Sequence, residues 1–255
     1  MNKKLTIFSL LVFAIAGSLL AQTRPEHVAI GDIYCSNGDI VTPDTYGSRT
    51  DGIGVVFYVD ETMLRGWIAY CKHSEALAWY NGSSSAEFPG LAYYQTIRYG
   101  NSSDPATEWL IKDVNGEKNT DDVENFDENF GDFPAFAYVR TLGSGWYLPA
   151  AGQLNFMFAY IPVLNNSLQK LIESGVECNP FFTTSWDGFD NDYSGYWTSD
   201  VYGKKNARKL TNAWYICGNP PSLSNVQFAG GFYSAHVTTT MRVRAVRSFN
   251  LTETE

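Results

Sequence analysis

Few side chains of this 255-residue chain are of a type and spacing that could perform catalysis. The three histidines, His27, His73 and His236, lie far apart in the sequence. His73 and His236 could each act as a general base, but neither has a nucleophile motif beside it. The chain also has no Gly-x-Ser-x-Gly, no His-Glu-x-x-His, no phosphate-binding loop and no dinucleotide fingerprint. We therefore expect a protein that is not an enzyme and that uses no cofactor.

Two acidic segments could supply carboxylates for acid–base chemistry or for a metal ion. We interpret the first, between residues 121 and 132, as a solvated helix edge. It contains Asp121, Asp122, Glu124, Asp127, Glu128 and Asp132. The second segment is rich in the oxygen ligands that Ca²⁺ takes, and it contains Asp187, Asp190, Asn191 and Asp192. Its spacing does not fit an EF-hand loop, and aspartate is common in turns, so we favour a polar turn over a calcium site.

A basic segment stands out against the acidic background of the chain. Lys and Arg number 18 against 27 Asp and Glu, which gives a net charge of −9 and disfavours nucleic acid and anionic membranes as partners. A local positive patch on such a protein can orient an anionic or sugar-acid ligand. Aromatic side chains that follow it could offer rigid stacking surfaces. The predicted ligand-binding residues are Tyr202, Lys204, Lys205, Asn206, Arg208, Tyr215, Tyr233 and His236.

The first 21 residues have the features of a secretory signal peptide. Lys3 and Lys4 give a positive start, residues 5–20 form an apolar run, and Ala21 ends a small-residue cleavage context. The run is shorter than the roughly 20 residues that a membrane span needs, and no second apolar run follows. No cysteine directly follows the run, so a lipid anchor would have no attachment point. We expect export to the periplasm, the cell surface or the medium, with residues 22–30 as the mature N-terminal segment.

Export changes the interpretation of the four cysteines. They are widely separated and include no Cys-x-x-Cys pair, which argues against a metal site. In an oxidising compartment they are candidates for disulfides, and the alternative is four buried free thiols. Of the three possible connectivities we favour the one that joins neighbouring cysteines along the chain. These pairs are Cys35–Cys71 and Cys178–Cys217.

The pattern of strand and helix signals predicts an α+β domain. Residues 54–59 and 66–71 are β-branched and aromatic runs, separated by a loop of hairpin length. Apolar stripes at helical spacing cover residues 154–161 and 164–172, and Pro162 predicts a break between them. A further helix is predicted to start at Pro134, and strand signals return over residues 196–198, 213–216 and 241–249. We expect one domain over residues 31–250, terminal strands that pair, and a tail over residues 251–255.

Four short motifs resemble those of bacterial C-type-lectin-like surface domains, and they occur in the family's order. Residues 145–154 resemble its "GW-x-LP-[ST]-x-x-E/Q-L" signature, and residues 196–200 its "YW[ST]S" strand. Residues 212–214 resemble its "x-AW" strand, and residues 242–247 its closing "VR-[PA]-VR" segment. Upstream, residues 31–38 and 55–60 resemble the opening strands of its gut-bacterial branch.

The resemblance implies a C-type-lectin-like fold with paired terminal strands, two or three helices and a second small antiparallel sheet. The family includes adhesin-tip domains, C-terminal domains of collagen-like proteins and retroelement-diversified variable proteins, which bind ligands through late strands and loops. We therefore expect a secreted or cell-surface, adhesin-like module for a protein or glycan ligand. One alternative is a structural or tip subunit of a pilus-like assembly. Another is an enzyme of the formylglycine-generating type, whose "GNVWEW" segment and paired late cysteines are missing here. The sequence also departs from the family at Ala150, where Ser or Thr is usual.

Overall fold

The fold was examined in a computed structural model, which describes residues 27–82, 93–94, 110–126, 130–181, 195–203, 211–217 and 231–252. These residues form helices and three β-sheets, so the predicted α+β class is confirmed. No helix in the described ranges is long and apolar enough to cross a membrane. The signal-peptide prediction, over residues 1–21, lies outside them. Val28 is already 1% exposed and Leu251 still donates to the Leu64 carbonyl, so the packed fold extends slightly beyond the predicted domain boundaries.

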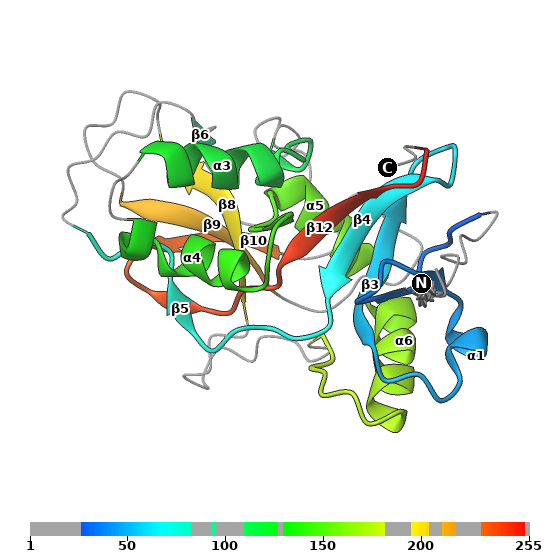
Figure 1. Cartoon of the computed structure of the whole chain (residues 1–255). Helices are drawn as coiled ribbons and strands as arrows, with labels where there is room; N and C mark the ends of the chain where they lie inside the picture. The colour runs from blue at the N-terminus through cyan, green and yellow to red at the C-terminus, as the bar shows by residue number, and fades with distance from the viewer. Residues whose placement is uncertain are drawn as a thin grey trace, which may run out of the picture.

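The largest sheet is antiparallel and has the strand order β2-β1-β3-β4-β12-β7. Its strands are β1 (Ile33–Cys35), β2 (Ile40–Val41), β3 (Gly52–Val59), β4 (Arg65–Tyr70), β7 (Trp146–Tyr147) and β12 (Val246–Asn250). The β3–β4 hairpin is the predicted one, and in its connection the Asp60 carboxylate accepts from the Thr62 backbone N–H. The first and last strands share this sheet but do not pair with each other, because the β3–β4 hairpin lies between them (Figure 1). The predicted direct pairing of the terminal strands is therefore wrong.

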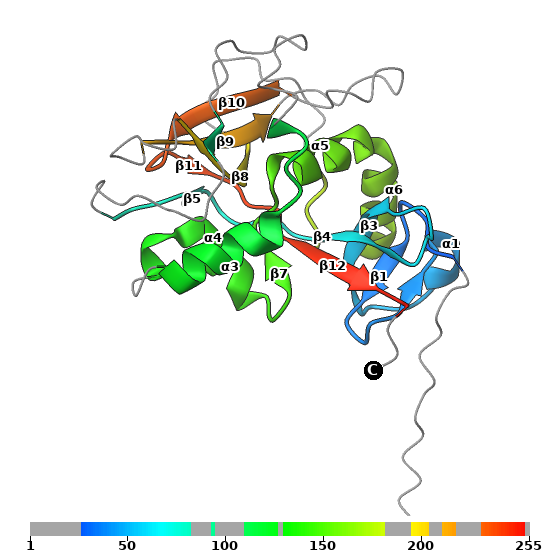
Figure 2. The ribbon, with the colours of Figure 1, turned by 90° about the horizontal axis from the view of Figure 1, so that it is seen from above.

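Two consecutive helices, α5 (Ala151–Ala159) and α6 (Ile161–Glu173), cover one face of this sheet. The predicted apolar stripe of α6 is buried against β3, since Leu164, Leu168 and Leu171 are all inaccessible to solvent. Pro162 lies in the first turn of α6, where its missing N–H is not needed, and this confirms the predicted break between the two helices. Helix α5 also contacts β8 and β9, so it joins the large sheet to the next one (Figure 2).

A second sheet has the order β10-β9-β8-β6 and carries most of the predicted binding residues. Its strands are β6 (Tyr93–Tyr94), β8 (Tyr196–Tyr202), β9 (Asn212–Cys217) and β10 (Gly231–His236). All described pairings are antiparallel except that of β6 with β8, which is parallel. A small third sheet pairs β5 (Leu77–Ala78) with β11 (Thr240–Met241). The fully buried Trp197 indole on β8 donates to the Leu77 carbonyl and so ties the second sheet to the third.

The other helices in the described part of the chain are α1 (Pro43–Tyr46), α3 (Gly116–Phe126), α4 (Pro134–Thr141) and the 3₁₀ turn η1 (Phe130–Asp132). Helix α4 starts at Pro134, as predicted, and α3 lies beside it. Helix α3 bears three of the clustered carboxylates on its surface. Arg140 of α4 forms ion pairs with Asp121 and with Glu124 of α3. These carboxylates therefore join two helices at the surface, in keeping with their interpretation as a solvated helix edge.

Candidate functional site

The alternation of side chains along β9 and β10 divides the predicted binding residues between two faces of the second sheet. Tyr215 lies opposite Tyr233, and Asn212 lies opposite His236. Because successive side chains of a strand point to opposite faces, Tyr233 and His236, three positions apart, lie on different faces. Tyr202 lies opposite Asn212 and shares the face of His236. The predicted residues therefore form two groups, a division that the period of a strand could have revealed from the sequence.

One face carries a row of aromatic rings across three neighbouring strands. The rings of Tyr215 and Tyr233 stack with their centroids 5.7 Å apart, and both side chains are half-buried. On the next strand, β8, the fully buried Trp197 ring packs edge-on against Tyr215 with the ring centroids 6.1 Å apart. Gly195 keeps this packing possible, because a Cβ there would lie 2.6 Å from the Tyr215 ring. Tyr215 is therefore held between Trp197 and Tyr233, while part of the surface of both tyrosines stays exposed.

The other face carries a polar row at the end of the sheet where β8 and β9 are connected. The ring of Tyr202 packs edge-on against Trp214 at 5.1 Å, and Trp214 is 3% exposed. His236 is exposed, and its Nδ1 lies 2.8 Å from the Thr238 hydroxyl. This row belongs to a surface different from that of the Tyr215–Tyr233 stack. A single compact ligand would therefore contact one group or the other.

The remaining predicted ligand residues fall outside the part of the chain that the structure describes. This applies to Lys204, Lys205, Asn206 and Arg208, which stand between β8 and β9. It also applies to Asp187, Asp190 and Asp192, the oxygen ligands considered for a calcium ion. Both assignments stay predictions. Among the described residues, no group of three or more His, Cys, Asp or Glu side chains is placed to hold a metal ion.

Sequence reasoning missed a buried polar cluster centred on Arg244, just before β12. This guanidinium is inaccessible to solvent and donates to the carbonyls of Tyr70, Cys71 and Asn179 at 2.9–3.1 Å. It also lies over the Phe181 ring, 4.2 Å from the centroid. The alternation of charged and apolar residues over 242–247 signalled a strand, but only packing could show that this arginine points inward.

His73 lies in the same cluster and is held in its neutral form. Its Nε2 is 2.6 Å from Arg242 and its Nδ1 is 3.3 Å from Arg244. Burial, followed by the charges of Arg244 and Arg242, lowers its pKa to about 3. A base of such low basicity captures protons poorly near neutral pH, so the candidate role of His73 as a general base is not favoured.

A pair of buried carboxyl groups is formed by Asp113 and Asp200. Asp200 is inaccessible to solvent, and its Oδ2 accepts from the Ala151 N–H at 2.7 Å. This contact supplies the N-terminal cap of α5 that Ala150, without a hydroxyl group, cannot provide. Burial and the neighbouring Asp113 carboxyl raise the pKa of Asp200 well above its ordinary value. The pair has no exposed face for a substrate and therefore has a structural role.

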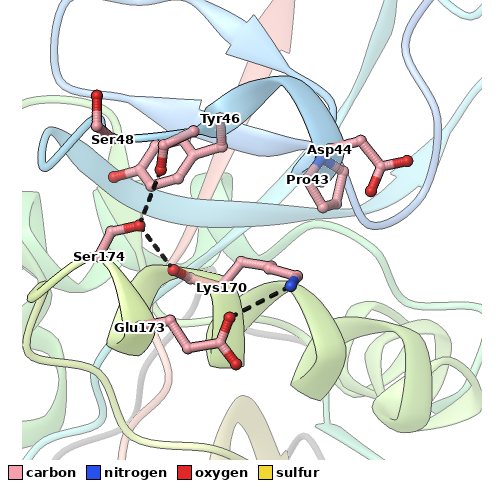
Figure 3. A pocket seen from close by; sticks show the side chains of 8 residues that line it. Pro43, Asp44, Tyr46, Ser48, Lys170, Glu173 and Ser174 are labelled. Carbon is pink, nitrogen blue, oxygen red and sulfur yellow. Dashed lines mark hydrogen bonds and ion pairs between the residues drawn. The ribbon is translucent and has the colours of Figure 1, made fainter.

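A pocket of about 490 Å³ lies between α1 and α6, away from the second sheet (Figure 3). Lys170 and Glu173 form an ion pair on one side of it, and Ser174 donates to the Gly47 carbonyl across it. Asp44 and Ser48 complete its polar lining. These side chains include no nucleophile paired with a base, so the pocket does not indicate catalysis.

The arrangement of the cysteines in the structure differs from the predicted pairing. All four cysteines are free thiols. Cys35 on β1 and Cys71 after β4 lie on either side of β3, so two strand spacings, roughly 10 Å, separate their backbones. This exceeds the limit of about 7 Å for a disulfide and excludes the predicted Cys35–Cys71 bond. Cys178, predicted to pair with Cys217, instead has its thiol beside that of Cys71.

Comparison with known proteins adds no relative to this description. No protein-family model matches the chain, and no curated protein matches it in sequence.

Proposed function

We propose that this chain is an exported, C-type-lectin-like binding module that recognises a protein or glycan ligand and performs no catalysis. The observation that carries the binding proposal is the half-buried Tyr215–Tyr233 stack on the second sheet. The Tyr215 ring packs against Trp197 on one side and against Tyr233 on the other, so little conformational entropy is lost when a ligand covers the stack. Such a surface suits the flat face of a sugar ring or an apolar side chain of a protein.

The placement of the four resembling motifs supports the C-type-lectin-like part of the proposal. Residues 145–154 form β7 and the start of α5, and residues 196–200 belong to β8. Residues 212–214 begin β9, and residues 242–247 lead into β12. The motifs thus occupy a sheet that contains both the first and the last strand, a covering helix and a second sheet. Apart from the direct pairing of the terminal strands, these are the components that the family resemblance implies.

The absence of catalysis is proposed from the environment of the groups that could act as acids or bases. His73 is flanked by two arginines, and Asp200 has no contact with solvent. His236 is exposed but interacts with a threonine hydroxyl rather than with a nucleophile held for attack. None of these groups combines accessibility with a reactive partner in the described structure.

The test is a binding screen with matched variants. The exported chain is applied to a glycan array and to a panel of surface proteins, and each hit is measured again with Tyr233→Ala and Tyr233→Phe. We expect at least a tenfold loss of affinity for Tyr233→Ala, corresponding to about 1.4 kcal/mol, and near-normal binding for Tyr233→Phe, which keeps the ring.

Tyr58 provides the matched control. Its side chain is also half-buried and its ring stacks on Trp67 at 4.2 Å, but it lies in the large sheet. Tyr58→Ala should therefore bind normally. Equal losses in Tyr58→Ala and Tyr233→Ala would show that the effect is one of stability and would contradict the proposed site. Recovery of fibre subunits as the sole binding partner would favour the alternative, a subunit of a pilus-like assembly.

A further inference from the structure

Two segments that are distant in the sequence lie against each other beside the Arg244 cluster. Residues 71–73 follow β4, and residues 177–179 follow α6. The Asn179 N–H donates to the Cys71 carbonyl at 3.0 Å, and the His73 N–H donates to the Asn179 side-chain oxygen at 3.2 Å. Lys72 and Glu177 form an ion pair next to these contacts. The contacts involve Cys71, the two residues after it and the residues on both sides of Cys178, so the two cysteines are held side by side.

Arg244 fixes the distance between the two backbones. Its guanidinium donates to the Cys71 carbonyl at 3.0 Å and to the Asn179 carbonyl at 2.9 Å. The Cys71 carbonyl accepts from the residue next to Cys178, and the two thiols share a hydrogen bond, so the sulfur atoms already lie next to each other. The backbone therefore needs little rearrangement to accept a bond between the two sulfur atoms.

The two thiols are also prepared chemically for exchange. Cys178 is half-buried, whereas Cys71 is 2% exposed. The pKa of Cys71 is lowered, chiefly because the Cys178 thiol donates a hydrogen bond to it, and also because Arg244 and Lys72 lie nearby. The pKa of Cys178 is raised, since its proton is held in that hydrogen bond. The pair thus contains an accessible sulfur and a neighbouring sulfur with thiolate character.

The other two cysteines lack these features. Burial, and to a smaller extent the charge of Asp51, raises the pKa of the Cys35 thiol to about 11. Burial also raises the pKa of Cys217 to about 11. Neither thiol has a neighbouring cysteine sulfur that could take its proton, as Cys71 can for Cys178, so each is a poor nucleophile. The structure therefore separates the four cysteines into one prepared pair and two inert thiols.

We propose that Cys71 and Cys178 form a disulfide when the chain meets a disulfide-bearing oxidant, while Cys35 and Cys217 stay reduced. The Cys178 sulfur passes its proton along the hydrogen bond to the Cys71 sulfur, attacks one sulfur of the oxidant and expels the first oxidant thiolate, which then takes this proton from Cys71. The Cys71 thiolate then attacks the Cys178 sulfur and expels the second oxidant thiolate. The two protein hydrogens are taken up by the released thiolates, so the protein loses two hydrogens and two electrons and the oxidant gains them. This proposal is independent of the binding function.

The bond would brace the segment after α6 against the end of β4. It closes a loop of about 100 residues, and a crosslink of that size restricts the unfolded chain strongly. We expect oxidation to raise the Tm by roughly 10 °C for a protein of this length. It would also hold Asn179 and Phe181 in contact with Arg244 in the core.

The experiment is peptide mapping of the purified full chain after reduction and then exposure to oxidised glutathione. Free thiols are alkylated and the protein is digested with trypsin without reduction. Cleavage after Lys and Arg places the four cysteines in four different peptides, since residues 66–72 contain Cys71 and residues 171–204 contain Cys178. We expect these two peptides to be linked, and the peptides with Cys35 and Cys217 to be alkylated. Intact mass should fall by two hydrogens.

Single variants provide the controls. Cys178→Ser should abolish both the linked peptide and the gain in Tm on oxidation, whereas Cys217→Ser should keep both. If Cys178→Ser does not fold, the wild-type map still decides the question. Four alkylated cysteines after oxidation, or a linked peptide that contains Cys35 or Cys217, would overturn the proposal.

Discussion

Replacing Asp200 by asparagine should change how the stability of this protein depends on pH. In the native structure the Asp200 carboxyl group is inaccessible to solvent, and its pKa is raised well above the ordinary value of 3.8. The main cause is burial, and the Asp113 carboxyl adds to it. Between the ordinary pKa and the raised one, the folded chain therefore holds a proton that the unfolded chain has lost. A raised pKa stabilises the fold below the unfolded-state value, and this contribution is lost as the pH rises.

The magnitude follows from one proton. Over this window the Asp200 contribution to the free energy of unfolding falls by about 1.4 kcal/mol for each pH unit. Asparagine has the shape of the protonated acid. Its oxygen can accept from the Ala151 N–H, which Asp200 does at 2.7 Å, and its NH₂ group can donate toward Asp113 in place of the acid proton. The variant should therefore fold, keep the cap of α5 and lose this part of the pH dependence.

The assay is urea unfolding, followed by tryptophan fluorescence, at several pH values above about 4. The quantity to plot is the difference in unfolding free energy between Asp200→Asn and the wild type, because the contributions of other titrating groups cancel. His73, whose pKa is lowered, contributes a slope of the opposite sign and would mask the effect in the wild type alone. We expect the difference to grow in favour of the variant by about 1.4 kcal/mol per pH unit. A difference in unfolding free energy that does not change with pH would refute the reasoning. This holds whether the constant difference is near zero or a loss of several kcal/mol in the variant.

Three further predictions concern the core, the basic segment and the histidine cluster. Trp197→Ala should lower the free energy of unfolding, measured by urea titration, by about 3–5 kcal/mol, because it removes a fully buried ring and its hydrogen bond to the Leu77 carbonyl. A decrease below about 1 kcal/mol would contradict this prediction. Lys204→Ala and Arg208→Ala should leave the free energy of unfolding within about 0.5 kcal/mol and weaken attachment to an anionic ligand, most clearly at low salt. A large loss of stability would show that the segment is structural. The His73 imidazole should stay unprotonated in NMR spectra above about pH 4, because its pKa is lowered to about 3. Protonation of His73 near neutral pH would contradict its burial between Arg242 and Arg244.

Several local elements of this protein can be predicted from its amino-acid sequence alone. The β3–β4 hairpin, the start of α4 at Pro134 and the break at Pro162 were all predictable. Each depends on residues that are neighbours in the chain, because the spacing of apolar side chains and the φ angle of proline act over a few positions. The placement of Tyr233 and His236 on opposite faces of β10 also follows from the sequence, because residues three positions apart in a strand point in opposite directions.

Contacts between segments that are distant in the sequence become apparent only in the tertiary structure. The terminal strands share a sheet without pairing because the β3–β4 hairpin lies between them, and this separates Cys35 from Cys71. Ala150 has no side-chain group that could cap helix α5, and the carboxyl group of Asp200 on β8 accepts from the first N–H of the helix instead. Arg244 is found inside the core because carbonyls from three separate segments converge on it, at Tyr70, Cys71 and Asn179. Composition and spacing show which groups a chain contains, but the partner that makes a buried charge or a paired thiol stable is fixed only when the whole chain packs.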